Sequence, residues 1–208
     1  MKTQVIENFF SQEDFDELCK LELNKTGPQE VKVYHNAING DNVIQNDCIN
    51  KNLLKKLNKN YHEKAMSILI ELNKEKAELY DYSEFHIIET GLNCKFPIHD
   101  DTPNKLLSGV IYLKPEKNLG TFFYNNKQGE GEREIEWKTN KGVFFSRTER
   151  QSWHSYKADN KSNRVVVVYN LMTKRIKEVY KIEKKNYIMG IFRFKLNPYF
   201  HKYLGFTL

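Results

Sequence analysis

The feature that most limits how this chain can fold is a succession of short apolar segments between residues 82 and 172. Turn residues separate these segments, as in Gly91-Leu92-Asn93, Gly129-Glu130-Gly131 and Asn140-Lys141-Gly142, and the segments have the length and alternation of strands. Strands joined by tight turns, without helices between them, are typical of a double-sheet jelly roll and not of alternating β and α units. The expected strands cover residues 84–89, 95–99, 106–113, 120–124, 132–137, 143–146, 152–157 and 164–171.

Helices are expected on the N-terminal side of this region. Over residues 50–77, leucine and other apolar residues recur every three or four positions with lysine and glutamate between them, which predicts one long amphipathic helix. Ser11, followed three residues later by Asp14, has the pattern of a helix start. We therefore expect an α+β chain that is mainly β, in which a double-stranded β-helix (jelly roll) core at 82–172 packs on supporting helices within 1–81.

A set of metal-ligating residues stands out within the expected core. His99-Asp100-Asp101 offers an imidazole and a carboxylate two residues apart at the end of an expected strand, and His154 opens a later one. Two histidines and one carboxylate on one side of an iron ion leave its other side open for a co-substrate and oxygen. By itself the H-x-D pattern arises often by chance, and a barrel histidine is more often a hydrogen-bonded core residue. Asp100 should point away from Asp101, because neighbouring residues of an extended chain face opposite sides.

Arg164 strengthens the interpretation of this set as a functional site. It lies ten residues after His154 and opens the apolar segment RVVVVYNL. An arginine at the start of a buried strand would lie inside the barrel, where its charge requires an anion. The far carboxylate of a dicarboxylic acid would supply that anion.

The segment from Tyr82 to Met172 resembles the Fe(II)/2-oxoglutarate-dependent dioxygenases, and among them the prolyl-4-hydroxylase-like group. The resemblance is carried by EFHIIETG, FPIHDD, LLSGVIYL, GTFFY and WHSY before NRVVVVYNL. In that family H-x-D is followed by a later histidine and then by a basic residue about ten positions on. Here the pattern corresponds to His99, Asp101 and His154, followed by Arg164.

The resemblance implies that these three residues hold Fe(II) and that Arg164 and the hydroxyl of Tyr112 bind 2-oxoglutarate. It also implies O2 as a further co-substrate and ascorbate as a reductant. The reaction hydroxylates an unactivated C–H and releases succinate and CO2. From the residues alone, Tyr112 can also be a strand aromatic packed in the core. Four further side chains correspond to the mouth of the pocket and are expected substrate contacts: Thr102, Asn104, Asn125 and Arg147.

Two positions depart from the family pattern. Val166 stands where many members with an arginine have serine, and Glu89 stands where some prolyl hydroxylases have tyrosine. These departures bear on the details of co-substrate binding and on the substrate, and not on the metal. The resemblance favours a prolyl or other peptidyl residue, in a protein or peptide, as the group that is hydroxylated.

Positive charge is concentrated at the C-terminal end. Residues 174–208 carry nine lysines and arginines against two glutamates, a local net charge of +7. This is more than the net charge of +6 of the whole chain. We expect a catalytic domain at 1–172 and a basic, aromatic-rich extension at 173–208, helical to about residue 185 and without a clear period beyond it. A solvated basic face explains such a composition, and so does nucleic acid or an anionic membrane surface. The aromatic residues interleaved with this charge are Tyr187, Phe192, Phe194, Tyr199 and Phe200.

The longest apolar stretches are of strand length, and the N-terminal sequence lacks the order of a signal peptide, so no transmembrane segment is expected. Cys19, Cys48 and Cys94 are scattered and form no CxxC pair, which suits a soluble protein of the cytoplasm or another reducing intracellular compartment. The oligomeric state stays open.

Three classes of function remain in view. Hydroxylation of a peptidyl residue is favoured by the resemblance. A nucleic-acid oxygenase, or one acting on a small molecule or sugar, would use the same iron chemistry. A non-catalytic jelly-roll binding module would share the barrel but would be expected to lack part of the ligand set.

Overall fold

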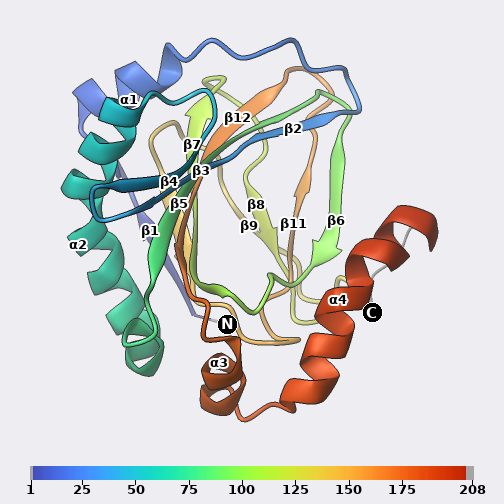
Figure 1. Cartoon of the computed structure of the whole chain (residues 1–208). Coiled ribbons are helices and arrows are strands. Elements are labelled where there is room, and N and C mark those ends of the chain that lie inside the picture. Colours follow the sequence, from blue (N-terminus) through green and yellow to red (C-terminus); the bar gives the residue numbers. More distant parts are fainter. Residues whose placement is uncertain (1, 205–208) are drawn as a thin grey trace.

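The computed structural model describes residues 2–204, with residues 197, 198 and 201–204 described as backbone alone. Residues 205–208 of the expected extension therefore lie outside the described part. Two antiparallel sheets face each other, and helices cover the outer face of the larger sheet (Figure 1). This arrangement confirms the expected α+β jelly roll.

The larger sheet has the order β1-β10-β7-β12-β5-β3-β4, and β2 also pairs with β5. The smaller sheet has the order β6-β11-β8-β9. Strands of the larger sheet are β1 (Thr3–Ile6), β2 (Val31–Tyr34), β3 (Asn36–Asn39), β4 (Asn42–Asn46), β5 (Tyr82–Thr90), β7 (Lys105–Lys114), β10 (Gly142–Phe145) and β12 (Arg164–Met172). Strands of the smaller sheet are β6 (Lys95–His99), β8 (Thr121–Phe123), β9 (Arg133–Ile135) and β11 (His154–Lys157).

Two N-terminal helices pack on the larger sheet. Helix α1 (Gln12–Cys19) begins after Ser11, whose hydroxyl accepts the N–H of Asp14 at 3.2 Å, as the sequence predicted. Helix α2 (Lys51–Ala77) begins after Asn50, whose side chain accepts the N–H of Leu53 at 2.9 Å. Side-chain caps of this kind satisfy backbone donors that have no partner within the helix. The apolar side of α2 shares one hydrophobic core with the residues of β5, β7 and β12 that face the helices.

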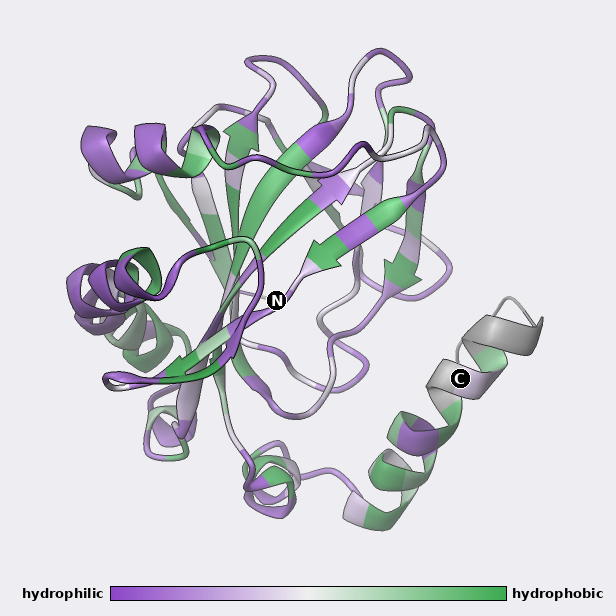
Figure 2. Cartoon of the chain, turned by 45° about the horizontal axis from the view of Figure 1, so that its top comes forward, coloured by the Kyte–Doolittle hydropathy of each residue, from purple (hydrophilic) through white to green (hydrophobic). Residues whose placement is uncertain are grey.

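The alternation along β12 explains why the larger sheet is buried on both faces. Val165, Val167 and Tyr169 pack in the core beneath the helices. Val166, between them, packs with Phe145 and other residues in a second cluster between the two sheets. Because successive side chains of a strand point to opposite faces, one apolar strand builds both cores. Figure 2 shows this concentration of apolar residues on the central strands.

The C-terminal extension forms two helices, α3 (Ile176–Ile182) and α4 (Tyr187–Leu204). Val179 and Tyr180 of α3 are buried, whereas α4 projects beside the barrel (Figure 1) and leaves Ile188 76% exposed and Phe192 61% exposed. The extension thus contains a second helix beyond the one expected to end near residue 185. Within the described residues, no helix has the length and apolar character needed to cross a bilayer.

Candidate metal centre

Two adjacent strands of the smaller sheet bring the three predicted ligands together. His99 ends β6 and His154 begins β11, and the two histidines are direct cross-strand partners with ring centroids 4.2 Å apart. Asp101 follows β6, and one ligand atom from each of the three residues lies within 4.8 Å of the others. The spacing His-x-Asp works because β6 ends at His99, which lets the chain bend and return the carboxylate toward the imidazoles.

Backbone carbonyls orient both imidazoles. Nδ1 of His99 lies 3.0 Å from the carbonyl oxygen of Pro97, and Nδ1 of His154 lies 2.9 Å from that of Ser152. A protonated Nδ1 satisfies these contacts and leaves Nε2 of each ring as the ligand atom. Burial, with the adjacent His154, lowers the pKa of His99 to about 3, so its ring is neutral and able to bind metal near pH 7.

Asp101 is 8% exposed and its carboxylate is held at both oxygens. Ser108 of β7 donates to Oδ2 at 2.5 Å, and the ammonium of Lys105 lies 2.7 Å from Oδ1. Burial alone would raise the pKa of Asp101, but Lys105 and the two histidines hold it well below its usual range. Oδ2 is 4.0 Å from Nε2 of His154, so two of the candidate ligand atoms face each other.

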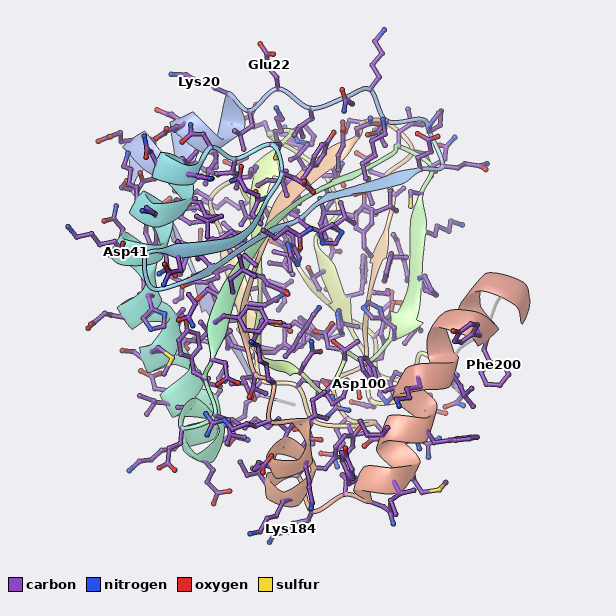
Figure 3. The ribbon with its side chains drawn as sticks, viewed as in Figure 1. Lys20, Glu22, Asp41, Asp100, Lys184 and Phe200 are labelled. Atoms are coloured by element: carbon purple, nitrogen blue, oxygen red, sulfur yellow. The ribbon has the colours of Figure 1, made fainter. Side chains whose placement is uncertain are left out.

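Asp100 points away from this group and supports the loop that precedes His154. Its carboxylate accepts the hydroxyl of Ser152 and, at 2.6 Å, the N–H of Arg150. Burial raises the pKa of Asp100. Figure 3 places Asp100 at the end of the barrel that faces α3 and α4. The expectation that Asp100 would face the other way from Asp101 is confirmed.

Arg164 lies inside the barrel, 5% exposed, among aromatic rings. Its guanidinium carbon is 3.9 Å from the ring centre of Tyr156, 5.5 Å from that of Trp137 and 5.6 Å from that of Tyr112. Within the described residues, Nε and Nη1 have no hydrogen-bond partner. Burial lowers the pKa of Arg164, as expected for a cation without a counter-ion. Such a group fits a carboxylate ligand, since an unpaired buried charge is costly.

Tyr112 is fully buried beside Arg164, and its hydroxyl contacts β8. It accepts the N–H of Thr121 at 2.9 Å and donates to Oγ1 of the same residue at 3.0 Å. Its ring stacks on Trp137 with centroids 4.5 Å apart. Tyr112, Trp137 and Tyr156 together surround the guanidinium, and we call this aromatic surrounding the Arg164 chamber. A role of Tyr112 as a 2-oxoglutarate ligand stays a prediction.

The sequence reasoning missed Tyr156, although a signal for it was present. Tyr156 follows His154 by two residues on β11, and residues two apart on a strand share a face. The period of two thus predicts an aromatic side chain on the same face of β11 as His154, and in the structure its ring packs on Arg164.

The four expected substrate contacts lie in different surroundings. Thr102 and Asn125 are exposed, and Asn104 is half-buried with an unpartnered Oδ1 within the described residues. Arg147 is 3% exposed and is engaged with the protein: Nε donates to the backbone oxygen of Asp101 at 3.1 Å, and Nη1 donates to Glu183 at 2.8 Å. These contacts give Arg147 a supporting position behind the metal centre, and its contact with a substrate stays a prediction, as do the other three.

Glu183, just after α3, is a supporting residue that the sequence did not suggest. Its carboxylate lies 2.7 Å from the ammonium of Lys76 on α2 and 2.8 Å from Arg147. All three side chains are almost fully buried. The C-terminal extension is thereby joined to the backbone of a metal-ligand candidate.

No protein-family model and no curated protein sequence matches the chain. Solved structures do. A prolyl-4-hydroxylase from Pseudomonas putida is 14% identical with a TM-score of 0.53, over 83% of this chain and 92% of that one. An oxidoreductase of the 2OG-Fe(II) oxygenase family from Burkholderia pseudomallei is 12% identical with a TM-score of 0.58, over 82% and 84%.

A third similar structure is a prolyl hydroxylase from Trichoplax adhaerens, in complex with a peptide fragment of the hypoxia inducible factor oxygen degradation domain. It is 13% identical with a TM-score of 0.56, over 85% of this chain and 86% of that one. The chain therefore has the fold of the 2OG-Fe(II) oxygenases, and it carries a candidate His-Asp-His facial triad.

Proposed function

We propose that this protein is an Fe(II)- and 2-oxoglutarate-dependent dioxygenase that hydroxylates an unactivated C–H bond and releases succinate and CO2. The observation that carries the proposal is a buried arginine in the same barrel as the triad, two of whose nitrogens have no hydrogen-bond partner among the residues that the structure describes. Tyr156 connects the two, because it follows His154 by two residues and packs on Arg164. A metal site and a buried cation within one barrel match the two ends of 2-oxoglutarate.

The residues present fit these ligands. His99, Asp101 and His154 would hold Fe(II), and Arg164 would bind the distal carboxylate of 2-oxoglutarate. Bound iron and 2-oxoglutarate supply the oxidising chemistry, with O2 as co-substrate and ascorbate as an expected reductant. The chain itself keeps the His99 imidazole neutral and Asp101 charged, and the aromatic rings around Arg164 would shield the co-substrate from water. Tyr112 would add a second contact by turning its hydroxyl proton from Thr121 toward the carboxylate.

A prolyl or other peptidyl residue is the proposed acceptor. The support is the fold, since the similar structures include prolyl hydroxylases and one of them was solved with a peptide fragment. The substrate is thus a protein or peptide.

The direct test is iron-dependent formation of succinate from 2-oxoglutarate without added substrate. We expect this uncoupled turnover in the wild type, and its loss together with iron in Asp101→Asn. Asp41→Asn is a matched control because Asp41 is exposed at the β3–β4 turn, far from the barrel interior (Figure 3). If the wild type shows neither turnover nor iron binding, the protein is a jelly-roll binding module instead.

A nucleic-acid oxygenase is the second candidate, and α4 is the observation that favours it. The helix exposes Phe192 and Tyr199, at 61% and 63%, in the basic extension. Exposed aromatic rings near positive charge suit single-stranded nucleic acid. Binding of a single-stranded oligonucleotide should then fall steeply with salt and disappear when residues 187–208 are removed, a truncation that keeps Glu183. Absence of binding at low salt would exclude this candidate.

A further inference from the structure

The face of β5 that lies between the two sheets is polar near the start of the strand, and its neighbours across β12 and β7, Asn170 and Ser108, are polar too. Phe85 and Ile87 point into the core beneath the helices. The alternate residues Tyr82, Glu84 and His86 therefore point to the opposite side, between the two sheets. Ile88 shares that side and packs against the cluster of Tyr112 and Val166. Since a face between two sheets is normally apolar, this polar group requires an explanation.

Glu84 is the centre of the group. Its Oε2 lies 3.0 Å from Nε2 of His86 and accepts the side-chain amide of Asn170 at 3.2 Å. Burial alone would raise the pKa of Glu84, but His86 and Asn170 outweigh burial and the pKa is lowered. Lys105 is close enough to contribute, but its ammonium is paired with Asp101. Glu84 is therefore a charged carboxylate facing the barrel interior.

Two amide oxygens in this part of the barrel, one beside Glu84 and one near Tyr82, have no hydrogen-bond partner within the described residues. One is Oδ1 of Asn170, a fully buried side chain. Its orientation is fixed because only the amide nitrogen can donate to Glu84. The other is Oδ1 of Asn104, a side chain close enough to Tyr82 to affect its pKa. A buried acceptor without a donor costs free energy, which a ligand that brings a donor would recover.

This group lies next to the metal centre and away from Arg164. Asn170 is the cross-strand partner of Ser108, the residue whose hydroxyl donates to Asp101. Arg164 begins β12 six residues earlier, about 20 Å away along the strand. A co-substrate bound at Arg164 therefore leaves this end of the barrel to another molecule.

We propose that Glu84, Asn170 and Asn104 bind a basic side chain, lysyl or arginyl, of the peptide substrate. The inference rests on the proposed function and narrows it: the hydroxylated residue is this basic residue or stands beside it. The donors His86 and Asn170 already contact Glu84, and the atoms left without a partner within the described residues are oxygens, so the complementary group is rich in N–H donors and positively charged. A prolyl ring has no such donor, and an acidic side chain would be repelled by Glu84.

The test uses capped pentapeptides, Ac-Gly-Gly-Xaa-Gly-Gly-NH2, with lysine, arginine, norleucine, proline or glutamate at the centre. Binding is measured by calorimetry without oxygen, on protein loaded with Fe(II) and 2-oxoglutarate, so that no turnover occurs. We expect the lysine and arginine peptides to bind at least about tenfold more tightly than the norleucine peptide. Equal affinities, or no binding by any of the peptides, would overturn the proposal.

Variants locate the interaction. Glu84→Gln should weaken binding of the lysine peptide about tenfold or more and leave the norleucine peptide unaffected. Glu63→Gln, on the exposed side of α2, is the matched control and should change neither. Asn104→Ala removes an acceptor without exposing a buried charge, so it keeps the test available if Glu84→Gln fails to fold. A lysine peptide that binds both variants normally also overturns the proposal.

The same calorimeter separates this proposal from the proposed function. Binding of 2-oxoglutarate before any peptide is added reports on the triad and Arg164 alone. If 2-oxoglutarate does not bind, the proposed function fails. If it binds and the lysine peptide does not, the failure belongs to the basic-residue site.

Discussion

Glu183 gives the sharpest test of how the C-terminal extension supports the metal centre. Its carboxylate is 1% exposed and lies 2.7 Å from the ammonium of Lys76 and 2.8 Å from Nη1 of Arg147. It also accepts the N–H of Glu149 at 3.0 Å. Arg147 in turn donates through Nε to the backbone oxygen of Asp101 at 3.1 Å. One carboxylate thus compensates two buried cations and, through one of them, holds the chain at a metal ligand.

Glu183→Gln removes the negative charge and leaves both cations buried. Breaking a buried ion pair by removing one partner costs about 3–5 kcal/mol. For a domain of this size, that loss corresponds to a fall in melting temperature of roughly 6–20 °C. Loss of a group that orients a metal ligand also lowers metal affinity, by about 10- to 100-fold. Urea unfolding should report the first effect, and anaerobic calorimetry with Fe(II) the second.

Two variants separate stability from metal binding. Lys76→Met removes a cation but leaves Glu183 paired with Arg147, so it should destabilise the fold less and keep iron affinity within about threefold. Glu178→Gln, exposed on α3, should match the wild type in both assays. If the free energy of unfolding of Glu183→Gln lies within about 1 kcal/mol of the wild-type value, the buried charges do not stabilise the fold as proposed. If it is destabilised but binds iron normally, the connection to Asp101 is refuted.

Three further predictions concern other sites. His99→Ala should abolish iron retention, read as metal content after gel filtration; a variant that keeps its iron would contradict the ligand assignment. Arg164→Ala should keep iron but raise the 2-oxoglutarate concentration for half-maximal turnover about 10- to 100-fold, since it removes charge-assisted contacts worth roughly 1.5–3 kcal/mol. Burial alone would raise the pKa of Asp14, yet Lys56 and Tyr61 lower it below the ordinary 3.8; its charged form therefore stabilises the fold above that pH, and the contribution is lost in acid. In urea unfolding, Asp14→Asn should cost about 1–3 kcal/mol at pH 7 and much less near pH 2.

Most of the barrel could be predicted because its signals are local. Turn residues bound each strand, and the expected strand at 95–99 coincides with β6, while that at 164–171 falls one residue short of β12. The helix expected over 50–77 corresponds to α2, which begins one residue later because Asn50 is its N-cap. A strand needs only its own alternation and its own turns to be visible in the sequence.

The elements that were not predicted lack a local signal. The hairpin of β3 and β4 is rich in asparagine, a residue depleted in strands, and it is held by pairing with β5. Helix α4 has apolar residues on several sides, as the coloured part of the helix in Figure 2 shows, so no face stands out by period. The hairpin depends on its neighbour β5, and α4 lacks the amphipathic pattern by which a surface helix is recognised.

The metal centre and the Arg164 chamber could be read from the sequence for a chemical reason. A non-haem iron site of this kind uses imidazole and carboxylate ligands, and a dicarboxylate needs a cation. His99, Asp101, His154 and Arg164 are therefore residue types from which a function can be predicted. The buried residues that hold these side chains in place are not limited to particular residue types. Glu183 meets Lys76 across 107 residues, and any buried charge pair of the right shape could take their place.

The same reasoning explains why the substrate end is found from unsatisfied atoms and not from motifs. In the sequence, Asn170 is one polar residue at the end of an apolar strand. Asn170 can be recognised as a candidate binding residue only from the strand register, which places it between Glu84 and Ser108. Its side-chain carbonyl oxygen has no partner within the described residues. Iron and 2-oxoglutarate would constrain the triad and Arg164, so the polar residues beside the metal centre and away from Arg164 are free to provide whatever acceptors or donors the substrate needs. In a protein of this fold, substrate class is therefore best inferred from the buried polar atoms that the chain alone leaves without partners.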